Sequence, residues 1–195
     1  MMHRTITSTL VWIGCVLFVG AYASTAHAEI EVPDSARAEG ANDGGNARVE
    51  TRLLVDHDRV APGEDFRVGV LFTLDPDWHV YWRNSGEAGL PTRTEFGGEG
   101  LEFGELEWPA PHVFDMSGGE VTTFGYSKRV LLFAPATVNE TASGEIELTA
   151  KVDYLACKVD CIPGKGEMTR KLEVGETGTS ARSEVVELFE TFRSR

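Results

Sequence analysis

Two cysteines in the C-terminal part of the chain are the residues best suited to chemistry. Cys157 and Cys161 stand four positions apart, and Ile162-Pro163-Gly164 follows them directly. Residues four apart in an extended strand lie about 13 Å apart, whereas a disulfide requires Cα atoms within about 7 Å. The chain must therefore turn between the cysteines, and Asp160 and the Pro163-Gly164 pair suit a tight loop. We expect a disulfide at a sheet edge or hairpin tip.

A disulfide in this position has three interpretations. The first is a passive crosslink, but closing a loop of about five residues contributes only about 2 kcal/mol, less than a long-range bridge. The second is a pair that cycles between dithiol and disulfide, and the weak structural benefit favours it. The third is a copper or zinc site in which Cys157 and Cys161 join some of His57, His79 and His112. The sequence has no C-x-x-C and no His-x-His pattern to support a metal, so we expect a redox-active pair without a cofactor.

The charges between the cysteines distinguish the two sulfurs. Lys158 places a positive charge beside Cys157, whereas Asp160 places a negative charge beside Cys161. A nearby cation favours a thiolate and a nearby anion disfavours it. On charge alone, the sequence therefore favours Cys157 as the attacking thiolate.

The first 28 residues have the features of a secretory signal peptide. Arg4 precedes an apolar run, Leu10–Ala23, which leads to the small-x-small pattern Ala26-His27-Ala28. Cleavage after Ala28 would remove Cys15 and leave the cysteine pair in an oxidising compartment, where a disulfide persists. The apolar run is shorter than the roughly 20 residues of a comfortable membrane span, and an uncleaved anchor is the alternative.

Composition narrows the classes of partner. Residues 29–48 are rich in Glu, Asp, Ala, Asn and Gly, which predicts a flexible leader. The remainder has the size of one domain, and a chain that is 42% hydrophobic can bury a core. A net charge of −13 argues against nucleic acid, and no polybasic segment suits anionic lipid. We expect soluble or tethered protein partners and no small-molecule substrate.

Short β-like runs separated by turn residues continue from residue 49 to residue 174. In residues 145–153, Ile146, Leu148, Ala150 and Val152 alternate with polar residues, which is the period of a half-buried strand. The predicted strands are Val49–His57, Phe66–Leu74, Trp78–Arg83, Thr92–Phe96, Leu101–Trp108, Thr122–Ala134, Glu145–Leu155 and Met168–Val174. Seven or more such strands predict an all-β, immunoglobulin-like antiparallel β-sandwich over residues 49–175, with a barrel as the alternative.

The last segment, residues 176–195, differs from the rest. Ser183 is a candidate cap for a short helix that carries Val185, Leu188, Phe189 and other apolar residues on about one face. We expect a C-terminal helix there, or the start of a linker.

Three segments carry a resemblance to a known family. They are Tyr154–Gly164, Asp75–Asn84 and Thr123–Ser127, in that family's order along the chain. Over Val49–Val174 the sequence resembles the amino-terminal periplasmic domain of the DsbD family of disulfide reductases, including its ScsB-like branch. The resemblance implies an immunoglobulin-like periplasmic domain. Its cysteine pair would take electrons from a membrane-embedded relay and pass them to exported thioredoxin-like or cytochrome c maturation partners.

The resemblance also suggests roles for aromatic residues. In the family an aromatic loop shields the cysteine pair until a partner docks, and here Phe124 is the first candidate for the shielding ring, with Tyr126 second. Trp78, Tyr81 and Trp82 are candidates for a wall of the site, although an aromatic layer within the sandwich is the alternative.

The sequence also departs from the family pattern. The best-known member separates its cysteines by more residues, and the present spacing is closer to the ScsB-like branch. No segment resembles the membrane relay or the thioredoxin-like domain, so we expect either a fragment or a domain served by separate proteins. A non-catalytic binding or assembly domain with a structural disulfide, and a copper- or zinc-binding domain, stay open as alternative functions.

Overall fold

The structure is a computed structural model that describes residues 48–193. The predicted signal peptide lies outside these residues, as does the predicted leader apart from Arg48. Within the described range, no helix has the length and apolar character needed to cross a membrane.

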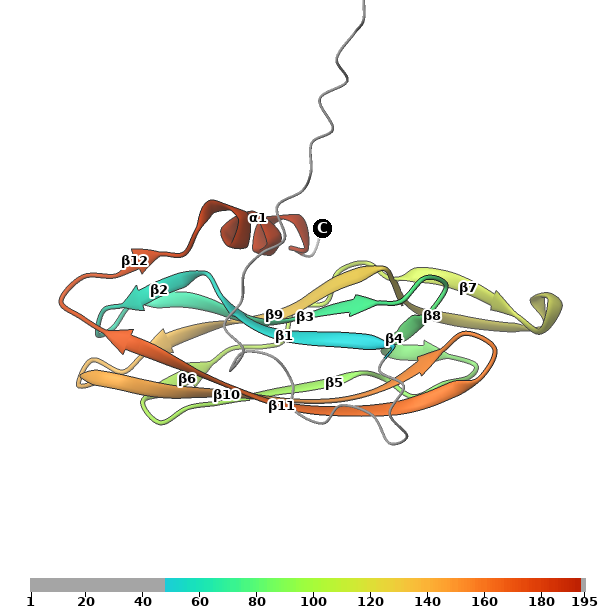
Figure 1. Cartoon of the computed structure of the whole chain (residues 1–195), viewed down its shortest axis with the longest axis horizontal. Coiled ribbons are helices and arrows are strands. Elements are labelled where there is room, and N and C mark those ends of the chain that lie inside the picture. Colours follow the sequence, from blue (N-terminus) through green and yellow to red (C-terminus); the bar gives the residue numbers. More distant parts are fainter. Residues whose placement is uncertain (1–47, 194–195) are drawn as a thin grey trace, which may run out of the picture.

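Two sheets pack face to face (Figure 1). The smaller sheet has the strand order β1 (Val49–Val55), β3 (Asp65–Leu74), β9 (Arg129–Val138) and β6 (Leu101–Phe103). The larger sheet has the order β12 (Thr179–Ser180), β2 (His57–Val60), β11 (Cys161–Val174), β10 (Gly144–Cys157), β4 (His79–Gly86), β8 (Val121–Ser127) and β7 (His112–Met116), and β5 (Arg93–Gly97) also pairs with β10. All strand pairs are antiparallel except β2 with β11. The predicted immunoglobulin-like sandwich is confirmed, and the barrel alternative is wrong.

The core lies between the two sheets. On β10, Ile146, Leu148, Ala150 and Val152 are buried while the residues between them are exposed or half-buried, as the alternation predicts. Phe72 of the smaller sheet contacts Tyr154 of the larger sheet edge-to-face, with ring centroids 5.8 Å apart. Because both rings are buried, this contact joins the sheets near the end of the sandwich that carries the cysteines.

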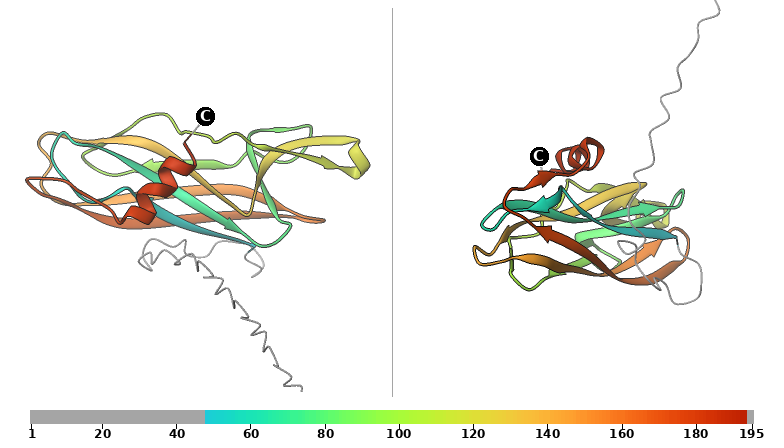
Figure 2. Two further views of the ribbon diagram at one scale, coloured as in Figure 1. Left: turned by 90° about the horizontal axis from the view of Figure 1, so that it is seen from above. Right: turned by 60° about the vertical axis from the view of Figure 1, so that its left-hand side comes forward.

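Helix α1 (Ser183–Thr191) covers the outer face of the smaller sheet (Figure 2). Its Phe189 is fully buried and packs edge-to-face on Phe133 of β9, with centroids 5.4 Å apart. The predicted helix is confirmed, but the predicted cap is wrong. Ser183 is the first helical residue, and the N-cap position is held by Arg182 without a side-chain cap bond.

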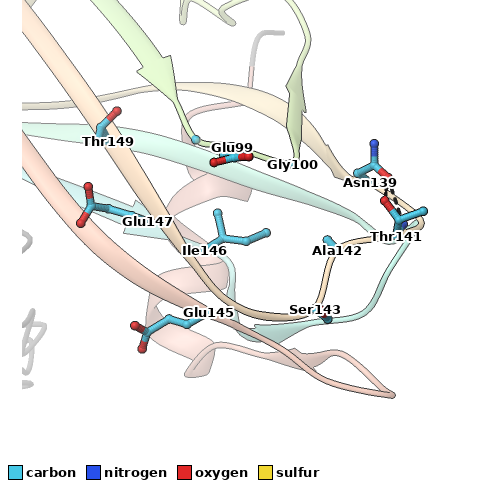
Figure 3. A pocket seen from close by; sticks show the side chains of 11 residues that line it. Glu99, Gly100, Asn139, Thr141, Ala142, Ser143, Glu145, Ile146, Glu147 and Thr149 are labelled. Atoms are coloured by element: carbon cyan, nitrogen blue, oxygen red, sulfur yellow. Dashed lines mark hydrogen bonds between the residues drawn. The ribbon is translucent and has the colours of Figure 1, made fainter.

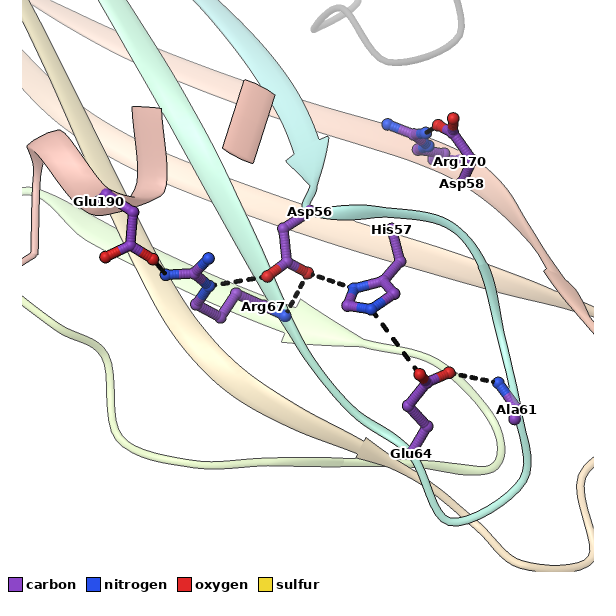
Figure 4. Close-up of polar contacts among 8 residues, drawn as sticks. All are labelled: Asp56, His57, Asp58, Ala61, Glu64, Arg67, Arg170 and Glu190. Atoms are coloured by element: carbon purple, nitrogen blue, oxygen red, sulfur yellow. Dashed lines mark hydrogen bonds and ion pairs between the residues drawn. The ribbon is translucent and has the colours of Figure 1, made fainter. Parts of the chain in front are cut away.

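Charged side chains fasten the helix to the sheet (Figure 4). Arg67 on β3 donates from Nε to Asp56 Oδ2 at 2.7 Å and from Nη1 to Glu190 Oε1 at 2.6 Å. The Arg67 guanidinium also lies 5.2 Å from the centroid of the Phe189 ring. Helix α1 is therefore held by an apolar contact and an ion pair at the same place.

Several predicted strand boundaries need correction. The predicted strand Thr122–Ala134 is two strands, β8 and β9, because Lys128 adopts a positive φ of 64° and reverses the chain. Strand β11 begins at Cys161 and not at Met168. Pro163 in β11 pairs with Leu155 of β10. The other strand that pairs with β11 is β2, and it does so at Glu173 and Val174. The stretch around Pro163 therefore has one neighbouring strand, and a residue without an N–H is tolerated there.

Further differences concern four other places along the chain. The predicted strand Leu101–Trp108 shortens to β6, and β7 was not predicted. Strand β4 continues to Gly86, beyond the predicted end at Arg83. The first predicted strand divides at Asp56 into β1 and β2.

Candidate functional site

The cysteines form the last pair of the longest hairpin. Strands β10 and β11 pair along their whole length, and Cys157 and Cys161 are the final register partners. The turn that joins the two strands is on the right in Figure 1, below β7 and β8. They form a disulfide with a Cα–Cα distance of 4.1 Å. The Lys158 N–H donates to Asp160 O at 3.1 Å and closes the three-residue turn. The predicted turn and hairpin tip are confirmed, but Pro163-Gly164 lies in β11 and not in the turn.

The two sulfur-bearing residues differ sharply in exposure. Cys157 is 0% exposed, whereas Cys161 is exposed to solvent. Alternation along β10 puts Ala156 in the core and Cys157 on the outer face of the sheet. On that face Cys157 meets side chains of the neighbouring strand β4, whose His79 is its register partner and whose Tyr81 contacts its sulfur.

Tyr81 provides a hydrogen bond to the buried sulfur. Its hydroxyl donates to Cys157 Sγ over 3.2 Å, and the side chain is 1% exposed. Burial raises the pKa of Tyr81, so the hydroxyl keeps its proton at neutral pH. Gly89 in the loop after β4 lies directly against the ring, with a positive φ of 86°. A side chain at this glycine would overlap the ring, so the loop depends on glycine to hold Tyr81 over the sulfur.

His79 lies in the same cluster. It is 5% exposed, it stacks on Phe114 of β7 with centroids 4.6 Å apart, and it meets Tyr81 edge-on at 5.2 Å. Burial lowers the pKa of His79 below its usual value of 6.5, because the charged ring would lose hydration. His112 lies near the cluster, with its ring 6.3 Å from Phe114, and is exposed.

The lowered pKa of His79 predicts a pH dependence of stability. As pH falls through about 6.5, the unfolded chain binds a proton that the folded chain takes up only at lower pH, so stability is lost on acidification. We expect the wild-type protein to lose more unfolding free energy between neutral and mildly acidic pH than a His79→Phe variant. Urea unfolding across pH measures this, and His112→Phe is the exposed control. Parallel losses in wild type and His79→Phe would contradict the prediction.

The predicted shielding residues lie on a strand and not on a loop. Phe124 and Tyr126 both belong to β8, so the predicted loop is wrong. Tyr126 is 4% exposed, belongs to the core and donates its hydroxyl hydrogen to Pro109 O at 2.7 Å. Phe124 is half-buried and meets Trp82 edge-to-face at 6.4 Å. The shielding role stays a prediction for both residues; Tyr126 is buried in the core, whereas Phe124 is only half-buried.

The three residues predicted to form a wall of the site lie in different surroundings. Tyr81 contacts Cys157, as described above. Trp82 and Trp78 are partly buried and pack against the core cluster, and the guanidinium of Arg48 lies 5.5 Å from the Trp78 ring. Tyr81 therefore lies at the site. Trp78 and Trp82 pack against the core, as the alternative of an aromatic layer within the sandwich predicts.

Of the three histidines in the alternative metal site, His79 lies opposite Cys157 and His112 lies near it across Phe114, whereas His57 is remote from the cysteines. His57 bonds to Asp56 through Nδ1 at 2.8 Å and lies 3.8 Å from Glu64 through Nε2 (Figure 4). Strand β2, which carries it, pairs with β11 at Glu173, about 40 Å along the strand from Cys161. Among residues 48–193, no three His, Cys, Asp or Glu side chains are grouped as metal ligands.

Lys158, whose charge was predicted to act on Cys157, forms an ion pair with Asp77. Lys158 Nζ lies 2.9 Å from Asp77 Oδ2, and both side chains are well exposed. Exposed ion pairs are screened by water, and this pair also offsets the positive charge beside Cys157. Exposure distinguishes the two sulfurs more strongly than charge does.

A surface hollow lies at the other end of the sandwich (Figure 3). It is bounded by the turn at Asn139 and Thr141 and by the first part of β10, including Glu145 and Thr149. Thr149 lies eight residues from Cys157 along β10, about 26 Å in an extended strand. The hollow is separate from the disulfide site.

Phe114 and Gly89 are site residues that the sequence interpretation missed, and His79 was considered only as a metal ligand. Tyr81 was singled out because the segment Asp75–Asn84 carries part of the family resemblance, and His79 lies in the same segment. Phe114 lies on the unpredicted strand β7.

The fold and site define a β-sandwich domain whose hairpin tip carries a disulfide between one buried and one exposed cysteine. The family model described as "Thiol:disulfide interchange protein DsbD, N-terminal" matches residues 50–173. The chain belongs to this family.

One solved structure supports the assignment of fold. The N-terminal periplasmic domain of ScsB from Proteus mirabilis superposes with a TM-score of 0.53 at 20% identity, over 80% of this chain and 57% of that one. The chain thus spans just over half the length of that relative. A cohesin module of a family 33 glycoside hydrolase from Clostridium perfringens gives a TM-score of 0.43 at 14% identity, over 64% of this chain and 95% of that one. No curated protein sequence matches the chain.

Proposed function

We propose that this chain is a periplasmic dithiol–disulfide exchange module. It takes electrons from a membrane-embedded relay of the DsbD type, in the same chain or a separate one, and passes them to exported thioredoxin-like or cytochrome c maturation partners. Family membership supports the reaction class. The observation that carries the proposal is the bond between an exposed Cys161 and a fully buried Cys157.

The difference in exposure between the two cysteines supports one order of events. A partner thiolate reaches the exposed sulfur of Cys161 and forms a mixed disulfide with it. The Cys157–Cys161 bond breaks, and its electron pair goes to Cys157 Sγ, which leaves as a thiolate. The Tyr81 hydroxyl already donates to this sulfur, so one donor is in place for the negative charge. A second partner thiol then reduces the mixed disulfide and leaves the dithiol form.

Shielding of the pair is part of the same proposal. Phe124, half-buried against Trp82 on β8, is the ring that we assign to this task. Tyr126 is retained in the core by its burial and its bond to Pro109.

Exchange with a dithiol protein tests the function. The oxidised chain is mixed with reduced thioredoxin, and the free thiols of each protein are counted by alkylation and mass spectrometry. Transfer of one disulfide per chain, with a reduction potential above about −300 mV, is the expected result. A potential well below that value, with no transfer, would favour the alternative of a structural disulfide in a binding domain.

Val159 at the hairpin tip is expected to contact the partner. It lies in the turn between the two cysteines and is 89% exposed. Val159→Asp is predicted to slow exchange with a protein partner about tenfold, because a charge would be buried at the centre of the contact. Reduction by dithiothreitol should stay unchanged, and stability should change by less than about 0.5 kcal/mol, since the side chain is at the surface. Stopped-flow kinetics measures both reactions.

Thr141→Asp, which adds the same charge at the distant hollow, is the matched control. Equal slowing of the protein and dithiothreitol reactions by Val159→Asp would contradict a contact role.

A further inference from the structure

His79 is a buried polar group at the redox site, and the proposed exchange reaction gives it no role. Its side chain is 5% exposed, and its Nε2 has no hydrogen-bond partner among residues 48–193. Leaving a buried polar atom unpaired costs about 1–3 kcal/mol. An unpaired nitrogen beside a disulfide indicates that it gains a hydrogen-bond partner in another state of the site.

His79 and Cys157 face each other across the ladder between β4 and β10. They are register partners, and directly opposed residues on one face have Cβ atoms about 4.5–5.5 Å apart. The neighbouring partners, Val80 and Ala156, both belong to the core, so His79 and Cys157 share the outer face. The ring of Tyr81, whose hydroxyl donates to Cys157, touches His79 edge-on at 5.2 Å.

We propose that His79 is a second hydrogen-bond donor to the Cys157 sulfur, and that its Nε2–H engages this sulfur only after the disulfide opens. The inference deepens the proposed function and rests on it. In the exchange step the partner sulfur bonds to Cys161 Sγ, the Cys157–Cys161 bond breaks, and the electron pair moves to Cys157. The partner sulfur is oxidised and Cys157 is reduced. The N–H of His79 then stabilises the departing thiolate, which makes Cys157 a better leaving group.

The charge state of His79 suits a donor that keeps its proton. Burial lowers the pKa of the ring, so at neutral pH it is uncharged and carries one N–H. The other titratable groups around the pair are Tyr81 on the same strand, His112 beyond Phe114 on β7, Asp160 in the turn, and the ion pair of Lys158 with Asp77. Lys158 and Asp77 are well exposed, whereas His79 and Tyr81 lie on the buried side of the sulfur.

A titration of the Cys157 thiol tests the inference. In the Cys161→Ser chain the thiolate is followed by its ultraviolet absorbance across pH, and the spectrum of the chain lacking both sulfurs (Cys157→Ser with Cys161→Ser) is subtracted. His79→Phe, which keeps an aromatic ring for Phe114 and Tyr81 to contact, should lower the thiolate-to-thiol ratio at a given pH about tenfold. Reduction of the disulfide by dithiothreitol should slow by a similar factor.

Two comparisons separate this role from a packing role. His79→Gln retains an N–H near the position of Nε2 and should preserve most of the thiolate ratio. His112→Phe changes the exposed histidine of the same neighbourhood and should leave the ratio unchanged. A His79→Phe variant that loses stability but keeps the wild-type ratio would overturn the inference.

Nitrogen NMR of the unaltered chain gives a test that does not depend on a variant folding. The Nε2–H signal of His79 should become protected from solvent exchange when the disulfide is reduced, and an unchanged signal would also overturn the inference. If the wild-type disulfide fails to exchange with thioredoxin, the proposed function is lost, while the titration still reports on His79. If exchange proceeds and His79→Phe behaves as wild type, only the inference is lost.

Discussion

A Cys157→Ser variant is expected to accumulate as a covalent complex with its redox partner, whereas a Cys161→Ser variant is not. In the first variant the exposed Cys161 forms a mixed disulfide, and the chain has no neighbouring thiol to release it. In the second, the remaining sulfur is at a 0% exposed position behind Tyr81 and cannot be reached by a folded protein. We expect about a hundredfold more complex through Cys161, because reaction depends on access as well as on thiolate content.

The two variants are matched controls for each other. Each removes the same disulfide, which closes a loop of about five residues and contributes only about 2 kcal/mol, so the loss of the bond itself is equal in the two variants. Expression in the cell envelope, followed by non-reducing gels and mass spectrometry, measures the complexes. Predominant capture through Cys157 would reverse the assignment and restore the order that the sequence charges favour.

The sequence predicted the sandwich from short apolar strands separated by turn residues, with a clear alternation on β10. On β10 the apolar residues point inward and burial follows the alternation, whereas β3 is buried continuously from Val68 to Phe72. Strand β7 has no such signal, since it pairs only with β8 and its residues are exposed or half-buried. A strand at the edge of a sheet needs no apolar face, so its sequence does not mark it. The division of β8 from β9 was missed because Lys128, a residue type without a turn preference, adopts the left-handed conformation.

The disulfide was predictable from sequence, but the residues that bury Cys157 were not. Four-residue spacing alone requires a turn between Cys157 and Cys161. The partners of Cys157, however, come from register: β4 places His79 opposite the sulfur and Tyr81 within hydrogen-bond distance, 76 residues away along the chain. No local pattern encodes such a pairing. The difference in exposure between the two cysteines arises from this cover, which is why charge alone led to the opposite order of reaction.

Gly89→Ala is expected to have a large effect on both stability and the site. The residue has a positive φ of 86°, and an added Cβ would overlap the ring of Tyr81. The backbone term costs about 1–2 kcal/mol and overpacking adds about 1–3 kcal/mol. Relief of the overlap requires Tyr81 to move, and its hydroxyl would then lose Cys157. We therefore expect a loss of about 2–5 kcal/mol in urea unfolding, together with faster alkylation of Cys157 in the reduced protein.

Gly144→Ala separates the steric effect from the backbone effect. Gly144 also has a positive φ, 80°, but no atom lies within 4 Å of the position that its Cβ would occupy. This control should lose only the backbone term, about 1–2 kcal/mol, and should leave the alkylation rate of Cys157 at the wild-type value. Equal losses in the two variants, with Cys157 equally protected, would mean that the loop yields without moving Tyr81. Because Tyr81 reaches the sulfur only while the loop holds its ring, the alkylation rate reports on the cover itself, independently of how much total stability each variant retains.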